Sequence, residues 1–208
     1  MSSTKLISIK KKELEKILQR IPQHPEPKPE LEQYVTPASI AADLLFLAYS
    51  DIVGNEVVDL GCGTGIFAIG AKLMGARKCI GVDKDEKAIA VAKQICNALG
   101  LKKIKFEVCR IEDFKTKCDT VIQNPPFGAQ EKQKHIDRIF IKKALELAPV
   151  VYSFHLTETK NFVKAFVESL NAGITFEKIY KFPIKYTFKF HRKEKLEFEV
   201  SLFRFERK

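Results

Sequence analysis

Between residues 56 and 170, short β-branched apolar runs alternate with longer amphipathic stretches. The apolar runs predict five strands, namely Val57–Leu60, Lys78–Val82, Ile104–Val108, Thr120–Gln123 and Val150–His155. The amphipathic stretches predict the helices between and after them, namely Ile66–Met74, Asp85–Leu99, Ile136–Leu147 and Glu158–Leu170. Such alternation indicates a parallel sheet that right-handed crossovers cover with helices on both faces.

The alternation stops near the C-terminus. Two strand-like runs, Ile174–Ile184 and Lys195–Arg207, follow each other with no helix between them. They predict a hairpin that adds an antiparallel strand to an otherwise parallel sheet. The predicted fold class is therefore α/β, a mostly parallel, doubly wound sheet with an antiparallel C-terminal hairpin.

The N-terminal part differs in composition. A short amphipathic helix is predicted from about Ile9 to Gln19, and four prolines between Pro22 and Pro29 indicate an extended linker. A further apolar helix is predicted over Pro37–Tyr49, with Thr36 as its N-cap and Pro37 as its first residue. We therefore predict two parts, an N-terminal helix with a proline-rich linker (residues 1–30) and one larger domain (residues 31–208).

Composition limits the partners and the compartment. The 208 residues carry a formal net charge of +10, which favours a polyanionic partner such as nucleic acid. The five cysteines are scattered without a C-x-x-C pair, which predicts reduced thiols and no metal site. The chain has no signal peptide and no apolar run near the ~20 residues of a membrane span. These features predict a soluble, cytoplasmic protein without a membrane partner.

A glycine turn, Asp59-Leu-Gly-Cys-Gly-Thr-Gly65, follows the first strand of the alternating region. Ligands of doubly wound sheets bind outside the carboxyl ends of the strands, and glycines let a ligand approach the backbone closely. The spacing is G-x-G-x-G, neither the dinucleotide fingerprint nor a phosphate loop. Asp83 ends the second strand, where an acid can accept from ribose hydroxyls. Its alternative role is to cap the next helix, for which Asp85 is the better candidate.

A second motif, Asn124-Pro125-Pro126-Phe127, follows the fourth strand. The prolines stiffen the loop and remove backbone donors. The Asn124 side-chain oxygen and the Pro125 carbonyl can then accept from the exocyclic amino group of a base. Phe127 can stack on the base, a contact that contributes about 1–3 kcal/mol. The alternative is a proline-stiffened strand end with a buried phenylalanine.

In this order, the glycine turn, Asp83 and the NPPF tetrapeptide resemble the seven-strand, Rossmann-like S-adenosylmethionine-dependent methyltransferases. An [NDS]-P-P-[YFW] tetrapeptide is typical of those that methylate amino groups. From Leu31 to Phe205 the chain resembles the methyltransferase-like 5 branch, small-subunit rRNA adenine-N6 methyltransferases and their archaeal relatives. The segments that carry the resemblance are LEQY, DLGCGTG, NPPFG, VYSFH and KFHRKEKLEFEV.

The resemblance implies S-adenosylmethionine as cofactor, with Asn124–Phe127 as the catalytic loop. It implies a cofactor site made of Gln33, Tyr34, Thr36, Asp59, Gly61, Gly63, Thr64, Gly65, Ile66, Asp83, Ile111 and Asn124. Tyr34 has two alternative roles, sandwiching the target base with Phe127 or packing on the sheet. Relatives often place an Asp after the third strand to contact the cofactor adenine, where this chain has Arg110. Either Asp113 or backbone groups around Ile111 replace that contact.

The segment from Lys181 to Lys193 mixes cationic and aromatic residues. Phosphate contacts and stacking are what RNA binding needs, whereas the alternative is a solvated basic face of the hairpin. The predicted RNA-binding residues are Lys185, Tyr186, Lys189, His191, Arg192 and Lys193.

The predicted function is methyl transfer to the N6 amino group of an adenosine in RNA, with small-subunit rRNA as the implied target. The resemblance also implies a small zinc-binding activator protein that forms a heterodimer with the chain. Two alternatives stay open, a protein glutamine N5-methyltransferase and a catalytically silent RNA-binding module. His155, at the end of the fifth predicted strand, is left without a role.

Overall fold

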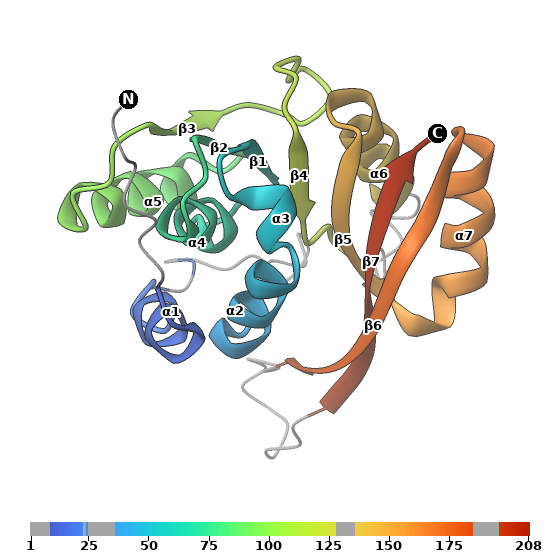
Figure 1. Cartoon of the computed structure of the whole chain (residues 1–208), viewed down its shortest axis with the longest axis horizontal. Helices are drawn as coiled ribbons and strands as arrows, with labels where there is room; N and C mark the ends of the chain where they lie inside the picture. The colour runs from blue at the N-terminus through green and yellow to red at the C-terminus, as the bar shows by residue number, and fades with distance from the viewer. Residues whose placement is uncertain (1–8, 23, 25–35, 128–135, 185–195) are drawn as a thin grey trace.

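The computed structural model describes residues 9–22, 24, 36–127, 136–184 and 196–208 (Figure 1). Its strands are β1 (Glu56–Leu60), β2 (Lys78–Asp83), β3 (Ile104–Val108), β4 (Thr120–Gln123), β5 (Val150–Leu156), β6 (Ala172–Ile184) and β7 (Leu196–Arg207). They form one sheet in the order β3-β2-β1-β4-β5-β7-β6. β1 to β5 are parallel, and β7 runs antiparallel to both β5 and β6. The predicted α/β sheet with its antiparallel hairpin is confirmed.

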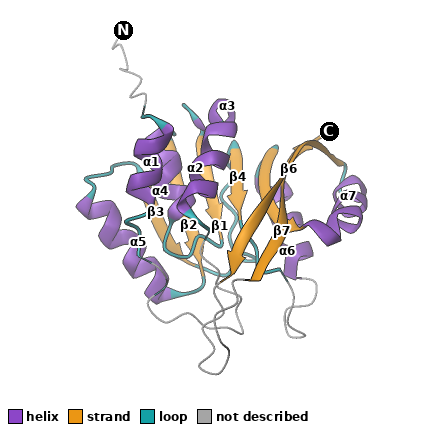
Figure 2. Ribbon diagram, turned by 90° about the horizontal axis from the view of Figure 1, so that it is seen from below, coloured by secondary structure: helices purple, strands orange, loops and turns teal. Residues whose placement is uncertain are grey.

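Helices cover both faces of the sheet (Figures 1 and 2). They are α1 (Lys11–Leu18), α2 (Ala38–Leu47), α3 (Tyr49–Ile52), α4 (Ile66–Met74), α5 (Glu86–Ala98), α6 (Ile136–Leu147) and α7 (Lys160–Ser169), with a short 3-10 turn at Thr157–Thr159. One apolar cluster joins the sheet to α1 through α5, and a second joins it to α6 and α7. The inner strands β1, β2, β4 and β5 are therefore buried on both faces, which explains their β-branched apolar sequences.

The order of the strands reverses between β1 and β4. The chain moves outward from β1 to β2 and β3, then returns to place β4 on the other side of β1. Leu60 at the end of β1 is the register partner of Gln123 at the end of β4. The two segments that follow, the glycine turn and the Asn-Pro-Pro-Phe loop, therefore leave the sheet side by side. A switch of this kind is where doubly wound sheets bind their ligands.

The start of α2 differs from its prediction. The helix begins at Ala38, and Pro37 has a non-helical ψ of 137° with no side-chain cap. The Pro37 carbonyl accepts the first helical bond, from the Ala41 N–H at 2.9 Å. Thr36 is therefore not the N-cap, because Pro37 occupies that position. The Thr36 hydroxyl oxygen accepts a hydrogen bond from Asn124. The predicted single helix over Pro37–Tyr49 is also divided at Ala48, between α2 and α3.

The N-terminal helix α1 packs on the main body rather than standing apart. Leu14 and Leu18 are buried in the same apolar cluster as α2 and α4. The proposed division at residue 30 stays a prediction, because residues 25–35 lie outside the described ranges.

Candidate active site

The glycine turn at residues 61–65 forms one wall of the candidate site. Gly65 has a φ of +87°, and a Cβ there would lie 2.7 Å from the Phe106 ring, so the position tolerates no side chain. Gly63 also has a positive φ, +52°, but no heavy atom of the described residues lies within 4 Å of where its Cβ would be. The turn is thus closed toward the protein at Gly65 and open at Gly63, where a ligand can approach the backbone.

Two acids at the end of β2 have separate tasks. The Asp83 carboxylate accepts from the Gly63 N–H at 2.8 Å and from the Asp85 N–H at 2.9 Å, one bond to each oxygen. Asp85 caps α5 by accepting from the N–H groups of Lys87 and Ala88. The capping role thus belongs to Asp85, as the sequence favoured. Each Asp83 oxygen keeps a free lone pair, so the carboxylate is oriented and can still accept from a ligand hydroxyl.

Asp59 lies beneath the glycine turn. The residue is 1% exposed, and its Oδ2 accepts from the Ala68 N–H at 2.9 Å in the first turn of α4. Burial is the largest cause that raises the pKa of Asp59 from an ordinary 3.8 to about 7, and the negative charge of Asp83 contributes to the same rise. Hydrogen bonds from the N–H groups of Ala68 and Phe67 act in the opposite direction. A cation bound over the turn would stabilise the Asp59 carboxylate.

Of the two polar atoms of the Asn124 side chain, only the nitrogen has a hydrogen-bond partner among the described residues. Its Nδ2 donates to the Thr36 hydroxyl oxygen at 3.0 Å, which fixes the plane of the amide. Its Oδ1 is buried and has no hydrogen-bond partner among the described residues. An unsatisfied buried acceptor costs about 1–3 kcal/mol, so this oxygen is suited to a donor that a ligand brings.

The rest of the loop packs against the protein. Pro125 is buried, and Pro126 and Phe127 are partly buried. The Phe127 ring meets the buried Phe182 ring of β6 edge-on, with centroids 6.4 Å apart and planes at 89°. This pair ties the orientation of the Phe127 ring to the C-terminal hairpin.

Several other residues of the predicted site have buried side chains. Thr36, Thr64 and Ile66 are buried around the turn and the loop. The Ile111 side chain is buried in the cluster beneath α6, so only its backbone is available to a ligand. Arg110 forms an ion pair with Glu112 at 3.2 Å. The predictions for Gln33, Tyr34, Lys185, Tyr186, Lys189, His191, Arg192 and Lys193 lie outside the described residues.

His24 is a residue that the sequence did not single out. Its imidazole is 5% exposed, and its Nε2 lies 3.0 Å from the Asp85 Oδ2. The contact places His24 at the start of α5, beside a residue two positions from Asp83. No local pattern identifies a histidine within a proline-rich stretch as a contact of a distant helix.

Within the described ranges, no helix has the length and the apolar character that a membrane span requires. The same part of the chain contains no group of three or more His, Cys, Asp or Glu side chains that could hold a metal ion. The five cysteines are all free thiols.

These residues fit S-adenosylmethionine. The open backbone at Gly63 admits a ligand, and the oriented Asp83 carboxylate beside it can accept from the ribose hydroxyls. Asp59 and Asp83 are acidic residues whose negative charge can complement the sulfonium and ammonium groups. The unpartnered Asn124 oxygen lies in the neighbouring loop, where an acceptor for a methylated amino group is needed.

The chain is similar to known methyltransferases. Residues 53–173 match the model of a methyltransferase domain family. The chain is 37% identical over 207 residues to the rRNA N(6)-adenosine-methyltransferase METTL5 of Danio rerio, covering 95% of this chain and 99% of that protein. It is 41% identical to an uncharacterised protein of Methanocaldococcus jannaschii, covering 96% and 95% of the two chains.

A solved structure is similar over the whole length. It is a protein of Pyrococcus horikoshii described as a candidate RNA methyltransferase, 38% identical, with a TM-score of 0.87. The match covers 100% of this chain and 99% of the other.

Proposed function

The chain belongs to the METTL5 family of rRNA N6-adenosine methyltransferases, and we propose that it methylates the N6 amino group of an adenosine in small-subunit ribosomal RNA. It is an RNA methyltransferase that depends on S-adenosylmethionine. The observation that carries the proposal is the buried, unpartnered Oδ1 of Asn124, next to the glycine turn across β1 and β4. An adenine amino group brings the N–H donors that this oxygen lacks.

The residues of the loop position the amino group. S-adenosylmethionine supplies an activated methyl group on its sulfonium sulfur. Asn124 Oδ1 and the Pro125 carbonyl accept the two N–H bonds of the adenine amino group, which directs the nitrogen lone pair toward the cofactor pocket. Phe127, oriented by Phe182, stacks on the base. Catalysis then rests on positioning, and the attacking nitrogen becomes more acidic as it is methylated.

His155 is not the general base of this reaction. The residue is 3% exposed, and burial lowers the pKa of its imidazole to about 3. A neutral imidazole with so low a pKa has little affinity for a proton at neutral pH. No base is needed before the attack, which agrees with the proposed chemistry.

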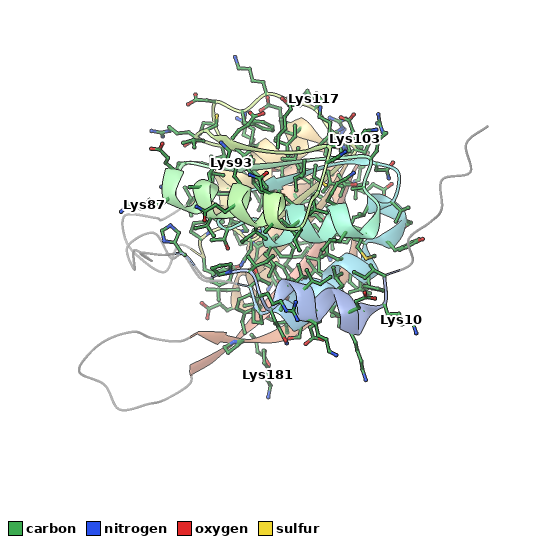
Figure 3. The ribbon with its side chains drawn as sticks, turned by 90° about the vertical axis from the view of Figure 1, so that its left-hand side faces the viewer. Lys10, Lys87, Lys93, Lys103, Lys117 and Lys181 are labelled. Carbon is green, nitrogen blue, oxygen red and sulfur yellow. The ribbon has the colours of Figure 1, made fainter. Side chains whose placement is uncertain are left out.

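The RNA surface extends from the C-terminal hairpin. Lys181 on β6 is exposed and projects away from the body of the protein (Figure 3). Lys93, Lys103 and Lys117 lie on the side of the same view opposite to Lys181. We therefore propose that the basic residues of positions 185–193, which continue from β6, contribute the specific RNA contacts.

We also propose the implied zinc-binding activator as a partner that extends the sheet. The sheet ends in β3 on one side and β6 on the other, and each edge strand exposes an apolar side chain. Val108 of β3 and Ile179 of β6 are both 50% exposed. Hydrogen exchange with and without the activator identifies the edge, since a strand added by the activator protects only the amides of the edge strand that it pairs with.

We further propose that the protein acts in the cytoplasm, since its five free thiols suit a reducing compartment.

The proposed function is tested by transfer of a labelled methyl group to purified small-subunit rRNA, followed by analysis of the nucleosides. We expect N6-methyladenosine as the labelled product, with the purified chain alone and with a co-expressed activator as parallel samples. Label in a protein glutamine instead would support the glutamine N5-methyltransferase. Cofactor binding with no transfer in either sample would support a silent RNA-binding module.

Cofactor affinity is expected to depend on pH through Asp59. The free protein holds this carboxyl with a pKa of about 7, above its ordinary value. A cationic cofactor favours the carboxylate, so binding releases a proton, and affinity rises as pH increases from about 5 to 7. Calorimetry in two buffers of different ionisation enthalpy measures the released proton. The folding stability of the cofactor-free protein should change in the opposite direction. Between pH 4 and 7 the folded state binds more protons than the unfolded state, so the free energy of unfolding falls as pH rises.

The control for this prediction is Asp59→Asn, which keeps an acceptor for the Ala68 N–H and removes the titrating group. It is expected to abolish the pH dependence of the cofactor affinity and to weaken binding at pH 8. A proton release that persists in Asp59→Asn would assign the effect to another group.

A further inference from the structure

A chain of polar side chains lies within the mostly apolar layer between the sheet and the helices α6 and α7. Gln123 Nε2 donates to Ser153 Oγ at 2.9 Å, and Ser153 Oγ lies 2.7 Å from His155 Nε2. Gln123 and Ser153 are register partners on β4 and β5, and His155 is two residues further along the same face. Gln123 and Ser153 are fully buried. This chain of hydrogen-bonded side chains ends next to Asn124, because Gln123 is the last residue of β4.

The Gln123 amide nitrogen donates to Ser153 Oγ. One proton is shared between Ser153 Oγ and His155 Nε2, and the tautomer of His155 decides which of the two atoms donates it. The imidazole packs beside the rings of Phe203 and Phe205, with centroids 6.1 and 6.2 Å away. The buried His155 thus holds Ser153, and Ser153 holds the Gln123 amide.

At the Gln123 end of this chain of side chains, one polar atom lacks a hydrogen-bond partner. Gln123 Oε1 is buried without a hydrogen-bond partner among the described residues, like the Oδ1 of the adjacent Asn124. A buried oxygen without a hydrogen-bond partner lowers the folding stability. Its presence therefore indicates a functional constraint rather than a contribution to stability. An apolar residue at position 123 would fit the cluster beneath α6 without that cost.

We propose that Gln123, Ser153 and His155 are positioning residues that hold the Asn124–Phe127 loop in the geometry of methyl transfer. They touch neither substrate nor cofactor in this proposal. The chain anchors the end of β4 from the α6 side, and Thr36 holds the Asn124 amide from the α2 side. The loop is thus restrained at its base on both faces of the sheet.

The experiment compares two buried serines in adjacent strands. Ser153→Ala breaks the chain of hydrogen bonds. Ser201→Ala removes an equally buried hydroxyl that is opposite His155 on β7 but bonds to Thr157 and Glu177, so it tests packing beside the imidazole without breaking that chain. Ser153→Ala is expected to lower kcat about 10-fold or more, since small misplacements of reacting groups are costly. Its KM and Kd for S-adenosylmethionine should stay unchanged, and Ser201→Ala should keep the wild-type kcat. Ser153→Thr, which restores the hydroxyl, should recover most of kcat.

A second variant separates positioning from folding if Ser153→Ala is unstable. Gln123→Met has a similar volume and removes the unsatisfied oxygen, so its thermal unfolding should occur at the same or a higher temperature. Its kcat should nevertheless fall. A stable Gln123→Met with wild-type kcat would overturn the proposal, as would equal losses in Ser153→Ala and Ser201→Ala.

The inference rests on the proposed RNA methyl transfer, so it also needs a readout without activity. The side-chain amide signals of Asn124 in ¹H–¹⁵N spectra, assigned by their loss in Asn124→Asp, should shift in Ser153→Ala and stay in place in Ser201→Ala. Wild-type protein that fails to methylate RNA would defeat the proposed function alone. Asn124 signals that do not respond to Ser153→Ala would defeat the positioning role alone.

Discussion

Asn124→Ala is expected to lower kcat for RNA methyl transfer by about 10²- to 10³-fold, the usual effect of removing one preorganised polar group from a reacting centre. The variant loses the buried Oδ1 that accepts from the target amino group. Cofactor affinity should change far less, because Gly63 and Asp83 belong to another loop. Stability should fall little, since an unsatisfied buried oxygen is removed together with the bond to Thr36. Single-turnover rates and cofactor calorimetry measure the two effects separately.

Two companion variants define what Asn124 contributes. Asn124→Asp keeps an acceptor, and the Thr36 hydroxyl can donate to the new carboxylate, so its kcat should lie between those of wild type and Asn124→Ala. Thr36→Val keeps the shape of Thr36 and leaves Asn124 Nδ2 without its partner, so it should cause a smaller loss than Asn124→Ala. An Asn124→Ala protein with wild-type kcat, or one that fails only in cofactor binding, would contradict the proposed role.

The fold could be predicted because its signals are local. Strand β4 reads Thr-Val-Ile-Gln and ends where two prolines prevent further pairing, and the structure ends it at Gln123. The C-terminal hairpin was predicted for a similar reason, since no helical pattern separates β6 from β7. The division between α2 and α3 at Ala48 was missed, because Ala, Leu and Tyr at this position carry no breaker signal.

The site could be predicted only as far as its motifs extend. The roles of Asp83 and Asp85 were separable, because their distances from the start of α5 differ and only one can cap it. The contact of Thr36 with Asn124 was not predicted, because it joins residues far apart in sequence, and a local capping rule assigned Thr36 to the helix instead. The Gln123–Ser153 bond depends on the register of two strands, which sequence periodicity does not specify.

Gly63→Ala is expected to weaken S-adenosylmethionine binding by roughly 5- to 150-fold, equivalent to the about 1–3 kcal/mol that an added methyl group costs in a filled space. The methyl would occupy the open position above the turn, beside the N–H that donates to Asp83. Placing alanine at a φ of +52° should cost about 1–2 kcal/mol of folding stability. That cost is not specific to the site, so binding must be compared with a variant of equal strain.

Gly100→Ala is the matched control. Gly100 follows α5 with a φ of +63°, and its Cβ would also have no described atom within 4 Å, so the strain is the same and no ligand is near. The two variants should lose similar thermal stability, while only Gly63→Ala loses cofactor affinity in calorimetry. Equal affinities in the two variants would show that the cofactor does not approach the backbone at Gly63. Gly65→Ala should behave differently from both, because its Cβ would meet Phe106 at 2.7 Å and the damage would fall on folding.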